Sequence, residues 1–196
     1  MYNHLVGNIT EKTPTYVVVE CNGIGFLVNI SLNTYTKIGE LKSAKLFTHL
    51  AIREDAHTLY GFADEQEREM FRMLISVSGV GSSTARMILS SLSPEEISTA
   101  IATGNVALLK GVKGIGEKSA QRIIVDLKGK VGISSKDMGA NIFITNNNTF
   151  KTEALSALNM LGFAKNIAEK GIEKALKVNP SINSVEDLIK QALKNI

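Results

Sequence analysis

Two short segments of this chain share a spacing of glycine and apolar residues that could bind an anion. The segments are Leu74–Leu89 (LISVSGVGSSTARMIL) and Leu109–Ile124 (LKGVKGIGEKSAQRII). A shift of 35 positions places Val77, Gly79, Gly81, Ala85 and Ile88 on Val112, Gly114, Gly116, Ala120 and Ile123. Each copy therefore predicts a helix, a Gly-X-Gly turn and a second helix, which is the helix-hairpin-helix pattern.

The chemistry of this pattern comes from its backbone. Glycine allows a tight turn with positive φ and leaves no Cβ in the way. Each turn ends where a helix starts, and the first N–H groups of a helix have no partner within the helix. These groups and the helix dipole favour an anion. Gly79, Gly81, Gly114 and Gly116 are therefore predicted to bind DNA phosphates, with Val80 and Ile115 anchoring the turns in the core. Such contacts carry no base sequence.

Polar side chains beside the turns could add to this binding. Lys118 and Arg122 are four residues apart beside the second turn and could reach one DNA strand. Ser82 and Ser83 follow the first turn and Ser119 follows the second, where hydroxyl groups can donate to phosphate without charge. Two ordinary turns with glycine caps are the simpler alternative. Two copies in register favour the binding interpretation.

Gly111–Ser119 (GVKGIGEKS) nearly matches the phosphate-binding loop of ATPases. That loop requires Lys directly after its second glycine, and here Glu117 intervenes. ATP binding by this chain is therefore not expected. The three histidines show no metal-ligand spacing, so neither a metal nor another cofactor is expected.

Composition sets the broad class. The chain has 196 residues, of which 44% are hydrophobic, enough for two to three small domains. A net charge of +3 does not indicate nucleic-acid binding by itself. The residues from Asn105 to Lys128 are more informative, with five basic and two acidic side chains. The single cysteine, Cys21, excludes an internal disulfide and fits a reducing cytoplasm, where we expect the protein to act.

Residues 1–63 are expected to form a five-stranded barrel of the oligonucleotide-binding (OB) fold. Asn22-Gly23 is a strong signal for a two-residue hairpin turn. The segments rich in β-branched and aromatic residues are Tyr16–Glu20, Gly25–Ile30, Lys45–Ile52 and His57–Phe62.

The rest of the chain is expected to be helical, so the fold class is α+β with several domains. Residues 64–128 would hold the tandem helix-hairpin-helix motifs, with a helix starting at Ser93-Pro94. Residues 129–149 are expected to be a flexible linker, in which Ile142-Phe143-Ile144 has no explanation. Residues 150–196 would form a small three-helix, UBA-like domain, with Thr152 and Ser184 as helix caps.

The predicted hairpin between the last two strands carries two adjacent carboxylates, Glu54 and Asp55. A solvated turn is the simplest explanation. A metal site would need a third ligand, and none is nearby in the sequence. A third interpretation is repulsion of DNA phosphates, which would keep duplex arms apart where strands must separate.

Taken together, these features resemble the RuvA family, the junction-binding subunits of the bacterial Holliday junction branch-migration complex. The resemblance spans nearly the whole chain, and its specificity comes from the order and spacing of the motifs. They are Arg53–Phe62 (REDAHTLYGF), Gln66-Glu67-Arg68 with Phe71, Gly79-Val-Gly81, Gly114-Ile-Gly116 with Ala120 and Arg122, and Leu158–Phe163 (LNMLGF).

The resemblance implies a non-catalytic homotetramer or double tetramer that holds a four-way junction open. Glu54 and Asp55 would form an acidic pin near its centre. The C-terminal domain would bind the ATP-driven RuvB motor through Leu158, Leu161, Phe163 and Leu193, and the RuvC resolvase is a further implied partner. Family members often carry basic residues directly after the hairpin glycines. Ser82, Ser83 and Glu117 depart from this, so backbone N–H groups are expected to dominate.

Two other functions remain open at this stage. Helix-hairpin-helix glycosylases and lyases place a catalytic lysine in the hairpin and an aspartate further on, and here Lys118 and Asp137 are 19 residues apart. However, Asp137 falls in the predicted linker, and no pocket for a flipped base is indicated. A protein-interaction adaptor, with the barrel and the C-terminal domain as its working parts, is the other alternative.

Overall fold

The computed structural model describes residues 2–131, 146–179, 182 and 184–195. The chain divides into two compact units, residues 1–134 and residues 135–196. Within the described residues, no helix is both long and apolar enough to cross a membrane. The expected Ile142-Phe143-Ile144 island and Asp137 both lie outside the described residues.

The first half of unit 1 is a closed five-stranded barrel with the strand order β1-β2-β3-β5-β4. All neighbouring strands are antiparallel except β3 and β5, which are parallel. The turn between β2 and β3 has φ of +49° at Asn22 and +83° at Gly23, which confirms the predicted hairpin. The elements are β1 His4–Lys12, β2 Tyr16–Cys21, β3 Ile24–Ile30, α1 Leu32–Ile38, β4 Ser43–Ile52 and β5 His57–Phe62.

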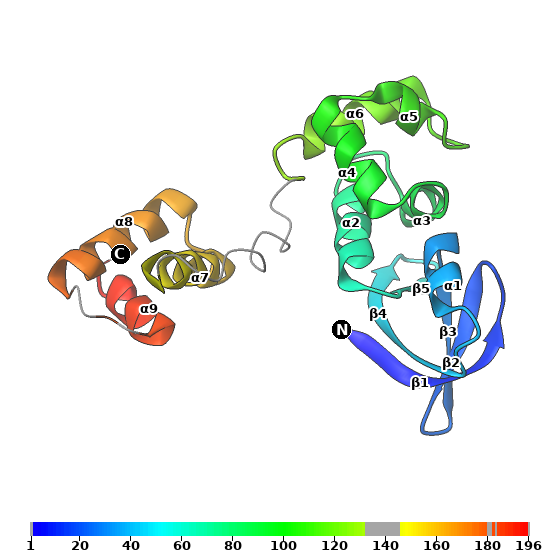
Figure 1. Cartoon of the computed structure of the whole chain (residues 1–196), viewed down its shortest axis with the longest axis horizontal. Coiled ribbons are helices and arrows are strands. Elements are labelled where there is room, and N and C mark those ends of the chain that lie inside the picture. The colour runs from blue at the N-terminus through cyan, green and yellow to red at the C-terminus, as the bar shows by residue number, and fades with distance from the viewer. Residues whose placement is uncertain (1, 132–145, 180–181, 183, 196) are drawn as a thin grey trace. The chain divides into compact units, whose positions relative to one another are not determined.

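The second half of unit 1 is helical. Figure 1 shows the barrel at one end of the unit and α5 and α6 at the other, with α2 and α3 between them. Ser93 caps α4 in a reciprocal capping box with Glu96, which confirms the predicted helix start. The helices are α2 Glu65–Ile75, α3 Ser82–Ser91, α4 Pro94–Thr103, α5 Val106–Lys110 and α6 Glu117–Leu127.

The barrel and the helices share apolar contacts. Phe71 of α2 is fully buried, and its ring centroid lies 4.9 Å from that of Phe62 and 5.1 Å from that of Tyr60, both on β5. The same hydrophobic cluster continues through α3, α4, α5 and α6. The expected boundary at residues 63 and 64 therefore separates two parts of one compact unit.

The described residues of unit 2 form three helices, α7 Asn146–Met160, α8 Lys165–Val178 and α9 Val185–Leu193. Ser184 caps α9 by accepting a hydrogen bond from the Asp187 N–H, as expected. Thr152 was expected to cap a helix, and this is wrong because it lies inside α7. The apolar spacing of Phe150, Ala154 and Leu158 carries the helix across it.

The segment expected to be a linker, residues 129–149, is only partly described. At its start, Val131 packs against the helical core of unit 1. At its end, α7 begins at Asn146, so the expected domain start at residue 150 lies within a helix. The predicted fold class is confirmed: a closed five-stranded barrel, a central helical segment with two hairpins, and a C-terminal helical unit.

Candidate nucleic-acid interface

The two Gly-X-Gly turns have the same backbone geometry. The φ angle is +89° at Gly79 and +86° at Gly114, a region that L side chains rarely adopt. The residues between the glycines, Val80 and Ile115, are buried in the helical core, as predicted. A side chain at either left-handed glycine would strain the turn, so the glycines are needed for conformation.

The second glycine of each turn has a different role. Gly81 and Gly116 are the N-caps of α3 and α6, with φ of −82° and −80°, which any residue can adopt. Neither helix has a side-chain cap, so no side chain occupies the N–H groups of its first turn. A Cβ at Gly116 would meet no atom within 4 Å. The missing side chain keeps these N–H groups open to an anion.

The side chains around the second turn are exposed. Lys118 and Arg122 both face solvent on α6, and Arg122 forms a weak ion pair with Asp126, with 3.9 Å between nitrogen and oxygen. Glu117, which could oppose a phosphate, is paired instead with Lys110 at 3.3 Å. This pair reduces the repulsion that its position would otherwise cause.

The first turn has no basic residue of its own. Ser83 is exposed at the start of α3, Ser82 is half-buried beside it, and Ser119 is half-buried at the matching end of α6. The two turns thus have similar backbone conformations but differ in the charge of the side chains beside them. Asp137, which the lyase alternative pairs with Lys118, cannot be placed because it lies outside the described residues.

The acidic pair lies at the tip of the hairpin that joins β4 and β5. Glu54 and Asp55 are both exposed, and the Arg53 N–H closes the turn by donating to the Ala56 carbonyl at 2.9 Å. In the part of the chain that is described, no group of three His, Cys, Asp or Glu side chains could hold a metal ion. The tip is also close to the first turn, because Arg53 Nη2 lies 3.5 Å from where a Cβ on Gly81 would be. No pattern in the sequence signals that Arg53 and Gly81 lie close together.

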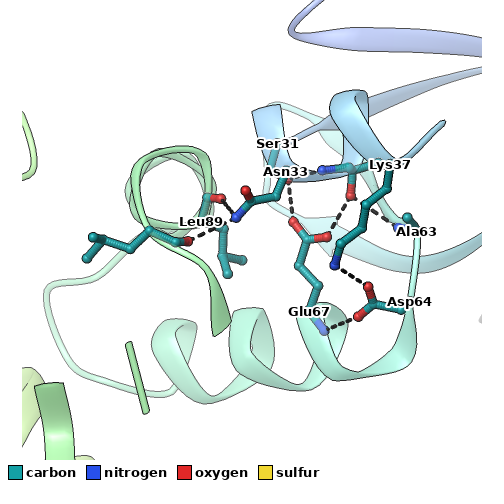
Figure 2. A network of polar contacts seen from close by, with 9 residues as sticks. Ser31, Asn33, Lys37, Ala63, Asp64, Glu67 and Leu89 are labelled. Atoms are coloured by element: carbon teal, nitrogen blue, oxygen red, sulfur yellow. Dashed lines mark hydrogen bonds and ion pairs between the residues drawn. The ribbon is translucent and has the colours of Figure 1, made fainter. Parts of the chain in front are cut away.

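A buried polar network attaches the helical hairpin to the barrel (Figure 2). The Glu67 side chain on α2 is 0% exposed, and its carboxylate accepts hydrogen bonds from Ser31 Oγ and from Thr34 Oγ1, the latter at 2.8 Å. Asp64 caps α2 by accepting from the Glu67 N–H at 2.8 Å and pairs with Lys37 of α1. Burial raises the pKa of the Glu67 carboxyl, although the two hydroxyl hydrogen bonds oppose that change.

α3 is attached to the barrel by further side chains. Asn33 Nδ2 donates to the Leu89 carbonyl at 2.6 Å, close to the Glu67 network (Figure 2). Arg86 Nη1 donates to the Thr15 carbonyl at 3.1 Å and to Asn29 Oδ1 at 2.9 Å. These bonds hold the helix that follows the first turn against the barrel that carries the acidic tip.

The four residues expected to bind a partner in unit 2 differ in exposure. Leu158 is 0% exposed and belongs to the core of this unit, so it offers no surface. Leu161 is 63% exposed and Leu193 is 41% exposed, while Phe163 is half-buried against the core. Met160, which the sequence analysis did not select, is 87% exposed beside them in sequence.

Family models and known proteins match this chain along most of its length. Residues 1–61 match the family model described as the RuvA N terminal domain, residues 71–129 match a SAM-like helix-hairpin-helix tandem, and residues 151–196 match the RuvA C-terminal domain. Proteins named Holliday junction branch migration complex subunit RuvA are 54% identical in Christiangramia forsetii, 50% in Flavobacterium psychrophilum and 49% in Bacteroides fragilis. Each alignment covers 100% of both chains.

Because the Glu67 carboxylate is buried, the difference in the free energy of unfolding between the wild type and Glu67→Gln should depend on pH. Because folding raises the pKa of Glu67, its stabilising contribution is fully present below the ordinary value of 4.5 and is lost as the pH rises through the folded value. The free energy of unfolding of Glu67→Gln should therefore fall further below that of the wild type as the pH decreases from neutral towards 4.5. Urea unfolding across this range measures the difference.

Glu69→Gln is the matched control, because Glu69 is on the same helix but its side chain is 52% exposed. The pH dependence of the difference from the wild type should be larger for Glu67→Gln than for Glu69→Gln. The same pH dependence in both variants would contradict the assigned pKa shift of Glu67.

Proposed function

The chain belongs to the RuvA family, and from this membership we propose that it binds Holliday junctions as a subunit of a branch migration complex. It acts as a non-catalytic scaffold that recognises the shape of the four-way junction and the spacing of its phosphates. The single observation that carries this proposal is the pair of matching hairpin turns, each of which ends in a helix N-terminus without a side-chain cap. Because these turns offer backbone N–H groups, binding would be independent of base sequence.

The acidic tip gives the scaffold a second role. Glu54 and Asp55 are exposed at the end of a hairpin that belongs to the same compact unit as the turns. Phosphates attracted to the helix N-termini would be repelled at the tip. We infer that this pair is the acidic pin, which keeps the strands of an open junction apart near its centre.

Further subunits would complete the complex. A tetramer, or a double tetramer, would place one copy of the paired turns on each arm of the junction. Unit 2 would bind the RuvB motor through Leu161, Leu193 and the exposed edge of Phe163, while Leu158 supports them from the core. The RuvC resolvase is a further proposed partner, and the ATP chemistry belongs to the motor.

A gel shift tests the proposal as a whole. The full chain should bind an immobile four-way junction more tightly than a linear duplex of matched length, in the presence of competitor DNA at a stated salt concentration. Equal affinity for both DNAs would leave a general helix-hairpin-helix binder. Binding to neither DNA would favour the adaptor alternative.

Replacing the second glycine of a turn should remove junction binding without strain. Gly116→Val fits the backbone, since φ is −80° and a Cβ meets nothing within 4 Å, but the side chain would cover the open N–H groups. We expect junction affinity to fall at least about tenfold, which corresponds to about 1.4 kcal/mol. Gel shifts measure the affinity, and circular dichroism checks the fold.

Thr36→Val on α1 is the control, because it introduces the same side chain at an exposed position of the barrel. It should bind the junction as the wild type does. Wild-type affinity in a folded Gly116→Val protein would overturn the hairpin assignment.

Neutralising the acidic tip should leave junction binding intact. The double variant Glu54→Gln with Asp55→Asn removes the repulsion, so affinity for plain duplex should rise by roughly threefold at low salt and less at high salt. Filter binding at several salt concentrations measures this change. The double variant Glu20→Gln with Glu40→Gln removes the same charge from the barrel surface and should have little effect. If both double variants raised the affinity for duplex equally, the change would come from the net charge of the protein and not from the position of Glu54 and Asp55.

Variants of unit 2 should show that exposed leucines affect partner binding and that a buried leucine affects stability. Leu161→Ala and Leu193→Ala should weaken binding to the RuvB protein of the same genome and change the free energy of unfolding by under about 0.5 kcal/mol. Leu158→Ala should lower that free energy by about 2–5 kcal/mol, because it leaves a cavity. Calorimetric titration and urea unfolding measure the two effects. Wild-type affinity in Leu161→Ala and Leu193→Ala would argue against this contact surface.

A further inference from the structure

Arg53 is an exposed cation between the barrel and the first hairpin turn. It follows β4 directly and precedes the acidic pair. Its Nη2 atom lies 3.5 Å from the position that a Cβ on Gly81 would take, which is an ordinary van der Waals distance. Gly81 is the N-cap of α3. The guanidinium group therefore lies beside the helix N-terminus to which a phosphate would bind.

This position is electrostatically unfavourable for an unpaired cation. The N-terminus of a helix carries a partial positive charge, which repels a guanidinium group. Among the residues that the structure describes, the Arg53 side chain forms no ion pair and no hydrogen bond, even though Glu54 and Asp55 follow it directly. An anion between Arg53 and the first N–H groups of α3 would satisfy both positive groups at once.

The surrounding structure holds the backbone of Arg53 in this place. Its own N–H donates to the Ala56 carbonyl at 2.9 Å, which closes the tip of the hairpin. On the other side, Arg86 bonds α3 to the barrel through Thr15 and Asn29. The Arg53 side chain thus extends from the hairpin between β4 and β5 towards the N-terminus of α3, and both elements are attached to the same barrel.

The first turn lacks a cation that the second turn has. Lys118 is exposed in the first turn of α6, but the matching position on α3 is Ser83. The two turns offer the same backbone N–H groups, so only the side-chain charge differs between them. Arg53 supplies a positive charge to the first turn from a different part of the chain.

We propose that Arg53 binds the DNA phosphate that is held by the first hairpin turn. This inference rests on the proposed function and assigns a further binding residue to the same site. The tip of the hairpin then acts on DNA in two ways. Arg53 attracts the backbone beside Gly81, and Glu54 and Asp55 repel it at the next positions. A strand held at the first turn would be directed away from the tip.

The salt dependence of junction binding tests this role. In the full chain, Arg53→Ala should reduce the slope of log affinity against log salt concentration by about 0.9 for each phosphate that is no longer neutralised. Between 50 and 200 mM salt, the advantage of the wild type over the variant should therefore shrink about threefold for each such phosphate. Arg53→Lys should keep most of the slope, because a lysine retains the charge.

Two further variants separate binding from packing. Lys42→Ala removes an exposed cation at the opposite end of β4 and should leave the slope unchanged. Ser83→Lys, introduced into Arg53→Ala, should restore the slope by placing a charge at the position that matches Lys118. Thermal unfolding of each variant shows whether the fold is retained.

Each outcome decides the question. A wild-type slope in Arg53→Ala overturns the inference, and so does a reduced slope that Ser83→Lys does not restore. If Gly116→Val loses junction binding while Arg53→Ala keeps the wild-type slope, only the role of Arg53 is refuted. If Gly116→Val binds the junction normally, the proposed function itself fails.

Discussion

The buried carboxylate of Glu67 is the constraint on which the arrangement of unit 1 depends. A charged group without partners in a protein interior costs several kcal/mol, so α2 is stable only where Ser31 and Thr34 can donate to it. That requirement fixes the register of α2 against α1, and the adjacent Lys37–Asp64 pair supports it. Because α2 leads directly into the first hairpin turn, this network sets the position of the turn on the barrel together with the Phe71 ring contacts and the bonds of Asn33 and Arg86.

Rigid attachment explains how a chain with a net charge of only +3 would present the proposed phosphate site. In the proposed function the attraction comes from backbone N–H groups at two helix ends, which follow glycines with φ of +89° and +86°. A few side chains then adjust the charge locally. Lys110 offsets Glu117 at the second turn, and Arg53 lies beside the first. On the hairpin between β4 and β5, the positive Arg53 is followed directly by the negative Glu54 and Asp55. This arrangement is suited to guiding a DNA strand along one path.

Unit 2 uses a different physical solution. Its core is rich in alanine, with Ala154, Ala168, Ala175 and Ala192 all fully buried, so its helices can pack closely around Leu158 and Ile172. Met160 and Leu161 lie outside this core and are exposed. Exposed apolar side chains of this size favour contact with another protein over contact with DNA.

Features that depend on local chain properties could be predicted from the residues alone. Glycine at a turn, apolar residues at helical spacing, Asn22-Gly23 and the Ser93 cap act on their own neighbours, so their consequences could be predicted. The remaining features depend on packing between segments that are distant in the sequence. Ser31 and Glu67 are 36 residues apart, and Arg53 and Gly81 belong to different elements, so no local pattern signals that they meet. Leu158 and Leu161 have equal hydrophobicity, and only the packing of three helices places one in the core and the other in solvent.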